Sequence, residues 1–177
     1  MEQPPPPPPP SSSSPPSSDD EAAAAAVAMA ELDPALHALG FQYQELSAEK
    51  VSGRLEVTKL CCQPFGVLHG GVSALVAESL ASAGAHVASG FRRIAGINLC
   101  INHLRPALLG HQLLLEATRL QLGNTIQVWD VESWIVSPST SIKETLISTA
   151  RVTLVCNLPV PENANGVSDV LKKYAKL

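Results

Sequence analysis

One long run of small and apolar residues, from Gly70 to about Ser89, sets the strongest constraint on the fold. Its apolar side chains recur three or four positions apart, which predicts a helix. Small side chains along this helix would let a sheet pack closely around it. They are Ala74, Ala77, Ala81, Ala83, Gly84, Ala85 and Ala88.

The segments on either side of the helix have the pattern of strands. Two strands are expected before it, in residues 41–46 and 51–58, and about four after it, up to Leu158. Gly123 and Asn124 form the turn of a predicted hairpin. Consecutive strands joined by short turns are antiparallel, so the order predicts an α+β domain in which one curved antiparallel sheet wraps one long helix.

The chain divides into three predicted regions: a disordered tail in residues 1–32, a folded domain in residues 33–158 and a C-terminal tail in residues 159–177. The first tail is rich in Pro, Ser and Ala, and its first twenty residues are almost all Pro, Ser or acidic residues, which cannot bury a core. Asp33 is a candidate N-cap and Pro34 a candidate first helical residue, so a short helix should open the domain.

Composition excludes several classes of partner. The net charge of −4 offers no basic patch for a phosphate backbone, so we expect no nucleic-acid partner. No apolar run reaches the roughly 20 residues of a membrane span, so we expect no membrane association. The four cysteines lack the spacing of metal ligands and are interpreted as free thiols in a reducing compartment. No metal or other cofactor is expected.

A polar stripe runs along the predicted helix, because Glu78, Ser82 and His86 follow one another at four-residue intervals. A buried carboxylate without partners is costly, so two interpretations of Glu78 stay open: a surface side chain, or a functional group that faces a site. We interpret His86 as a structural or pocket residue.

The helix begins with Gly70 and Gly71, directly after His69. Backbone N–H groups and the helix dipole at such a start favour the oxygen of a polarised carbonyl. His69 and Glu78 are nine positions apart, which is roughly 13 Å along a helix axis. One carbonyl cannot touch both within one chain. If both act on it, Glu78 comes from a second copy across a two-fold interface.

The motif Gln-x5-His-Gly-Gly-x6-Glu-x3-Ser, from Gln63 to Ser82, resembles the hotdog-fold acyl-CoA thioesterases. It matches the branch with a helix glutamate that includes the bacterial 4-hydroxybenzoyl-CoA thioesterases. Residues 61–86, 125–131 and 151–159 are similar to the plant peroxisomal thioesterases that act on 1,4-dihydroxy-2-naphthoyl-CoA in phylloquinone synthesis. The resemblance covers residues 33–158 and implies the hotdog fold.

The resemblance also implies roles for the residues of this motif. Glu78 would attack the thioester carbonyl or activate a water, and the sequence leaves both routes open. The Gly70 N–H would polarise the carbonyl oxygen, Gln63 and His69 would orient the thioester, and Ser82 would position the water or the carboxylate. The expected assembly is a homodimer or a homotetramer, a dimer of hotdog dimers.

The phosphates of CoA require backbone N–H groups and cations. The candidates for the CoA end of the site are Arg105, Asn124, Thr125 and Arg151, and Gly71 is a further candidate for binding the substrate or CoA. Arg105 and Arg151 could equally be solvated surface groups or members of ion pairs. His103 and His111 are interpreted as surface or turn residues.

The last three residues, Ala175, Lys176 and Leu177, are a close variant of the Ser-Lys-Leu peroxisomal address. No Lys or Arg occurs before Lys50, which argues against an N-terminal signal or transit peptide. We therefore expect the peroxisomal matrix as the location and an import receptor as a partner. An ordinary helical tail is the alternative.

Three functions remain in competition. The first is hydrolysis of 1,4-dihydroxy-2-naphthoyl-CoA, and the second is hydrolysis of other aromatic or fatty acyl-CoA thioesters. The third is a non-catalytic acyl-CoA-binding module of the same fold. Glu78 together with Gln63 and His69 argues against the third, because a protein that only binds has no need of a base at the carbonyl.

Overall fold

The structure, a computed structural model, describes residues 30–161 and 167–175. Most of the predicted N-terminal tail, residues 1–29, lies outside this range, as do Lys176 and Leu177. The elements are α2 (Pro34–Ala38), β1 (Gln42–Leu46), β2 (Lys50–Glu56), the 3-10 turn η1 (Lys59–Cys61), α3 (Gly70–Ala88), β3 (Arg93–His103), β4 (Gln112–Leu122), β5 (Ile126–Val136), β6 (Lys143–Leu158) and α4 (Val167–Tyr174).

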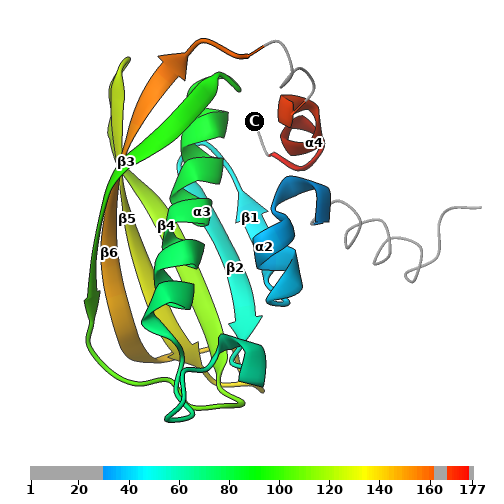
Figure 1. Cartoon of the computed structure of the whole chain (residues 1–177), viewed down its shortest axis with the longest axis vertical. Coiled ribbons are helices and arrows are strands. Elements are labelled where there is room, and N and C mark those ends of the chain that lie inside the picture. Colours follow the sequence, from blue (N-terminus) through cyan, green and yellow to red (C-terminus); the bar gives the residue numbers. More distant parts are fainter. Residues whose placement is uncertain (1–29, 162–166, 176–177) are drawn as a thin grey trace, which may run out of the picture.

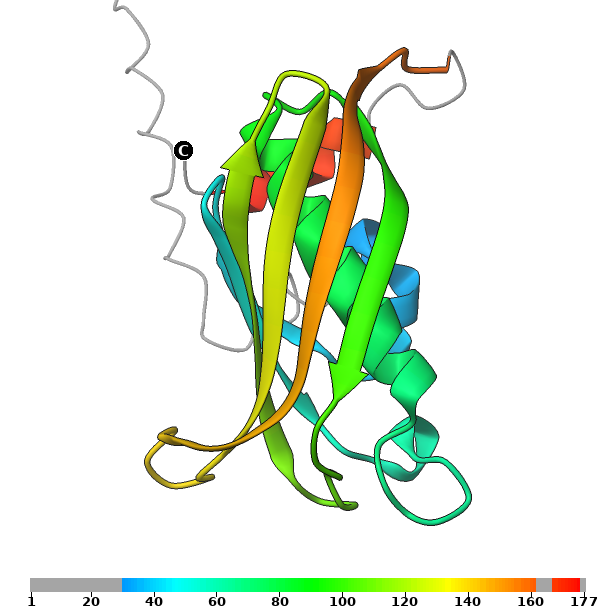
Figure 2. The ribbon, with the colours of Figure 1, turned by 90° about the vertical axis from the view of Figure 1, so that its left-hand side faces the viewer.

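The predicted fold is confirmed. Six antiparallel strands form one sheet in the order β1-β2-β4-β5-β6-β3. The sheet curves around α3, and α2 and α4 lie on the same concave side (Figures 1 and 2). The predicted cap of α2 is also confirmed, because the Leu36 N–H donates a hydrogen bond to Asp33 Oδ1 at 3.0 Å. None of the described helices is long and apolar enough to cross a membrane.

The sheet packs tightly on α3 because the helix presents small residues to it. A Cβ atom built at Gly84 would lie 2.4 Å from Cη2 of Trp129, which is fully buried in β5. The Trp129 Nε1–H donates to Gln127 Oε1 at 3.0 Å, and the Gln127 amide donates to the Ala85 carbonyl at 3.3 Å. Two strand side chains are thereby tied to the last turns of α3.

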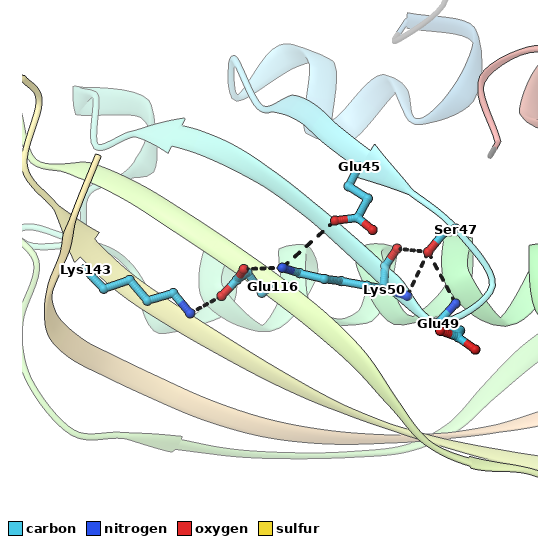
Figure 3. Close-up of polar contacts among 6 residues, drawn as sticks. All are labelled: Glu45, Ser47, Glu49, Lys50, Glu116 and Lys143. Carbon is cyan, nitrogen blue, oxygen red and sulfur yellow. Dashed lines mark hydrogen bonds and ion pairs between the residues drawn. The ribbon is translucent and has the colours of Figure 1, made fainter. Parts of the chain in front are cut away.

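A charged network crosses the outer face of the sheet (Figure 3). Glu116 of β4 pairs with Lys50 of β2 at 2.7 Å and with Lys143 of β6, and Glu45 of β1 lies 4.0 Å from Lys50. Burial would raise the pKa of Glu116, but the hydrogen bonds from the two lysines outweigh it and hold that pKa below its usual range. The network therefore links four strands while Glu116 is ionised.

The edge strand β3 has a hydrogen-bonded neighbour on one side only, namely β6. Within the described part of the chain, its other edge faces no strand. Ile97 is 58% exposed in the middle of this strand. A strand of 11 residues with an open edge is a template for pairing with another chain.

The two ends of α3 have different surroundings. Its first turn follows the loop of residues 62–69, and hydrogen bonds join that loop to the loop of residues 104–111. Near its last turn, His86 Nε2 lies 3.0 Å from Ser168 Oγ of α4, and the Ser168 hydroxyl donates to the Phe91 carbonyl at 3.1 Å. Burial lowers the pKa of His86, and Lys172 adds to this effect. The polar contact of His86 is thus with α4.

The fit of α3 predicts the outcome of enlarging Gly84. Alanine at a helix interior position normally stabilises by about 1 kcal/mol relative to glycine. At Gly84 the added methyl would overlap the Trp129 ring, so we expect Gly84→Ala to lower the free energy of unfolding by about 1–3 kcal/mol. Urea unfolding measures the difference, and Gly84→Ala combined with Trp129→Phe should recover part of it. A gain in stability for the single variant would contradict this packing.

Candidate active site

A short loop, residues 62–69, contains the predicted site residues Gln63 and His69 and ends at the start of α3. The His69 N–H donates to the Cys61 carbonyl at 2.8 Å, and the Gln63 N–H donates to the Val67 carbonyl at 2.9 Å. The Leu68 N–H donates to the Ala107 carbonyl at 2.8 Å, which ties this loop to the loop after β3. The backbone around Gln63 and His69 is therefore fixed from two sides.

His69 caps α3. Its Nδ1 accepts a hydrogen bond from the Gly71 N–H at 2.8 Å. Because Nδ1 is an acceptor, the neutral ring carries its proton on Nε2 and can donate outward. The Gly70 N–H, in contrast, has no acceptor among the residues that the structure describes. The cap therefore leaves the Gly70 N–H available for a carbonyl oxygen, but it occupies the Gly71 N–H, which was predicted to bind the substrate or CoA.

Gln63 is half-buried at the entrance of the same loop. Its Oε1 accepts a hydrogen bond from the Phe65 N–H at 2.8 Å. The bond uses the oxygen of the amide, so the NH₂ group is the part that can still bind a ligand. Gln63 and His69 thus both present donors, together with Gly70, and donors are what an oxyanion requires.

Glu78 lies half-buried on α3 and faces the edge strand β3. A Cβ atom built at Gly96 of β3 would lie 2.1 Å from Glu78 Oε1, so the carboxylate rests against the backbone of that strand. Ser82, one turn further along α3, is also half-buried. Of the two interpretations of Glu78, this position favours the one in which its carboxylate faces a site.

The helix keeps Glu78 away from the donors of its own chain. Gly70 and Glu78 lie in one uninterrupted helix, eight positions apart, which is about 12 Å along the axis. A thioester carbonyl bound at Gly70 is therefore out of reach of the Glu78 carboxylate of the same chain.

His103 lies beside the candidate site, a position that the sequence analysis did not predict for it. It ends β3, and its ring lies over the start of α3: a Cβ atom built at Gly70 would be 3.1 Å from His103 Cε1. It was predicted to be a surface or turn residue, and it is exposed, but it lies beside the free Gly70 N–H. The available signal was Gly70 itself, because glycine often marks a place where another group comes close to the backbone.

The other residues predicted for the CoA end are spread over the molecule. Arg105 follows β3 near the start of α3, and its backbone N–H donates to the Ile147 carbonyl at 3.2 Å. Asn124 and Thr125 lie in the turn between β4 and β5, near the last turn of α3. Arg151 is on the outer face of the sheet, where its guanidinium donates two hydrogen bonds, of 2.7 and 2.9 Å, to the Asp130 carboxylate in a bidentate ion pair.

An apolar groove of about 500 Å³ opens beside the start of α3. It is lined by Ala35, Ala38, Leu39, Leu60, Cys62, His69, Gly71, Val72 and Leu75. Two of these residues, His69 and Gly71, are predicted site residues, so the groove borders the donors at the helix start. Among the described residues, no three His, Cys, Asp or Glu side chains gather as a metal site would require.

The fold is an antiparallel sheet wrapped on one helix. The helix has hydrogen-bond donors for a carbonyl oxygen at its start and a carboxylate further along, and this combination defines a hotdog thioesterase. The chain belongs to the Thioesterase superfamily, whose profile matches residues 65–142. It is 52% identical over 143 residues to 1,4-dihydroxy-2-naphthoyl-CoA thioesterase 2 of Arabidopsis thaliana, covering 80% of this chain and 91% of that relative.

Two further relatives lie at about 30% identity. The 1,4-dihydroxy-2-naphthoyl-CoA hydrolase of Escherichia coli is 30% identical over 95 residues, which is 53% of this chain and 69% of the relative. The crystal structure of a thioesterase from Haemophilus influenzae superposes with a TM-score of 0.60 at 30% identity, covering 72% of this chain and 86% of that one.

The cap formed by His69 can be separated from its role toward a substrate. His69→Ala removes the acceptor for the Gly71 N–H and should lower the free energy of unfolding by about 1 kcal/mol. His69→Asn keeps an acceptor at the N-cap and should remain within a few tenths of a kcal/mol of the wild type. Urea unfolding distinguishes them. If asparagine destabilises as much as alanine, the hydrogen bond to Gly71 is not what His69 contributes to stability.

Proposed function

We propose that this protein hydrolyses 1,4-dihydroxy-2-naphthoyl-CoA to 1,4-dihydroxy-2-naphthoate and CoA, a step of phylloquinone biosynthesis. The observation that carries the chemistry is the arrangement on α3, which has a free N–H at Gly70 and an accessible carboxylate at Glu78. The identity of the acyl group is supported by the Arabidopsis and Escherichia coli relatives, whose names specify this thioester.

The donors at the start of α3 act on the carbonyl oxygen. That oxygen gains negative charge as the tetrahedral intermediate forms, and the Gly70 N–H, assisted by Gln63 and His69, stabilises it. In the general-base route, Glu78 takes a proton from water while the water oxygen attacks the carbonyl carbon. The C–S bond then breaks, and the CoA sulfur leaves as a thiolate that takes up a proton.

In the nucleophilic route, a Glu78 oxygen attacks the carbonyl carbon and CoA leaves first. Water then hydrolyses the resulting anhydride and restores the carboxylate. Both routes place the same carboxylate at the same carbon. Ser82, one turn beyond Glu78, is placed to bind the water or the carboxylate.

A homodimer completes the site. The open edge of β3 can pair with β3 of a second copy around a two-fold axis, which would extend the sheet across both chains. Glu78 faces this edge strand, so such an assembly would bring it toward the donors of the partner. Two equivalent sites would result, and a homotetramer would be a pair of such dimers.

The acyl group and the CoA moiety have different requirements. The apolar groove beside His69 and Gly71 has the character that a flat bicyclic acyl group needs, since few polar groups line it. Arg105, exposed near the same end of α3, is the cation we assign to the CoA phosphates. Asn124 and Thr125 lie at the opposite end of α3, so they would serve a site at Gly70 only from the partner.

The tripeptide Ala175, Lys176 and Leu177 supports location in the peroxisomal matrix, through an import receptor that reads this type of address. Imaging of a fluorescent fusion with a free C-terminus tests it, and we expect peroxisomal puncta. Deletion of the three residues should abolish them. Unchanged import after the deletion would show that this address is not used.

Glu78 should act across the interface, and mixing two inactive variants tests this. Glu78→Gln keeps the volume but loses the base, so kcat should fall by about 10²–10⁴-fold while substrate still binds. Gln63→Ala should be inactive because the thioester is no longer oriented by the donors at the start of α3. In a random mixture half of the dimers are mixed, and one of their two sites is intact. Activity should therefore return to about a quarter of the wild-type level per site.

The same assays distinguish the competing functions. If subunits demonstrably exchange and no activity returns, Gln63 and Glu78 serve one site from one chain. A panel of aryl-CoA and alkyl-CoA thioesters should give the highest kcat/KM for the naphthoyl thioester. A fatty acyl-CoA that is turned over faster would replace the acyl assignment. Binding of acyl-CoA without any thiol release would identify a non-catalytic module.

A further inference from the structure

We propose that Gly96 is a positioning residue for Glu78: its missing side chain leaves a notch in the edge strand β3, and the notch holds the carboxylate in its working orientation. The inference deepens the proposed function and rests on Glu78 being its reactive carboxylate. Gly96 is not part of the motif from Gln63 to Ser82. Its role emerges from the packing of α3 against β3.

The contact is closer than any other residue would allow. A Cβ atom built at Gly96 would lie 2.1 Å from Glu78 Oε1, 3.0 Å from the carboxyl carbon and 3.5 Å from Oε2. Real Cβ atoms essentially never approach within 3.0 Å of a heavy atom to which they are not bonded. The carboxylate therefore occupies the volume in which a side chain of residue 96 would begin.

Backbone conformation does not explain the glycine. Within residues 30–161 and 167–175, the glycines with a positive φ are Gly40, Gly66, Gly90 and Gly110. Gly96 is absent from this group, so another residue could adopt its backbone conformation. Glycine inside a strand also weakens the strand, because it has no side chain to pack and loses more entropy on folding. What glycine supplies here is space for the Glu78 carboxylate in the orientation that it has in this structure.

The strand is irregular at the same place. The pairing of β3 with β6 shifts its register between Arg93 and Ala95 and again between Gly96 and Asn98. Such bulges re-aim residues beside functional sites. Here the shifts flank the position that receives the carboxylate.

The notch matters because, among the described residues, 30–161 and 167–175, no hydrogen bond or ion pair restrains the Glu78 carboxylate. The side chain has several rotatable bonds, and without a restraint it would sample orientations that do not reach a bound thioester. Contact with the strand at Gly96 removes many of these orientations before the substrate binds.

Gly96→Ala tests the proposal. The added methyl displaces the far end of a flexible side chain, so the protein should fold and assemble as the wild type does. We expect kcat to fall by about 100-fold with KM within about twofold, because the carboxylate is displaced while the donors at Gly70 are untouched. Asn98→Ala, an exposed change two positions along the same strand, is the matched control and should keep wild-type kcat.

A double-mutant cycle shows whether Gly96 acts through Glu78. In the Glu78→Gln background the reactive carboxylate is already gone, so adding Gly96→Ala should change the residual rate by less than about twofold. Glu78→Asp has a shorter side chain that stops before the notch, and adding Gly96→Ala to it should also have little effect. An independent structural role would instead multiply the two losses.

Four results would overturn the proposal that Gly96 positions Glu78. Full activity of Gly96→Ala beside an inactive Glu78→Gln overturns the notch and leaves the proposed function intact. Full activity of Glu78→Gln overturns both. A rate loss that accompanies lost folding or assembly, measured by circular dichroism and light scattering, assigns Gly96 to stability and overturns the positioning role. Losses that multiply in the double-mutant cycle would also overturn the positioning role.

Discussion

The close contact between α3 and the concave face of the sheet is the interaction on which the rest of the structure depends. It requires small residues along one side of the helix, and at Gly84 the ring of Trp129 occupies the space of a side chain. This contact fixes the rotation of α3 about its own axis. Once that rotation is fixed, Glu78 and Ser82 can no longer point into the core. Both side chains are half-buried, and the Glu78 carboxylate lies against the edge strand β3.

The length of α3 then separates the two halves of the chemistry. The free N–H of Gly70 is at one end, and Glu78 lies about 12 Å along the axis. The strand that borders both positions is β3, which carries Gly96 beside the carboxylate and His103 beside the N–H. The same strand has the open edge of the sheet. Association through this edge would therefore build the assembly and the complete site in one step, so a change that prevents the backbone pairing of this edge should abolish subunit contact and catalysis together.

The parts of this structure that could be predicted from sequence are those set by local patterns. Asp33 caps α2 as expected, α3 begins at Gly70, and the hairpin turn falls at Gly123. Features that depend on distant residues were not predictable. The ring of His103 lies against Gly70, far away in the chain, and the sequence offers no spacing rule that joins them. Arg151 looked like a candidate for a phosphate, yet cross-strand register places it opposite Asp130, which already neutralises it.

Three glycines show why the sequence could predict close packing but not the function of each close contact. Gly70, Gly84 and Gly96 all lie in regular elements, and none has the positive φ that would require glycine. Each instead faces one side chain of another element: His103, Trp129 and Glu78, respectively. The contact at Gly84 sets the position of the helix, and the other two place polar groups at the proposed reaction centre. A glycine in a helix or strand with ordinary backbone angles therefore marks a point of contact, and only the folded partner shows whether that contact serves packing or chemistry.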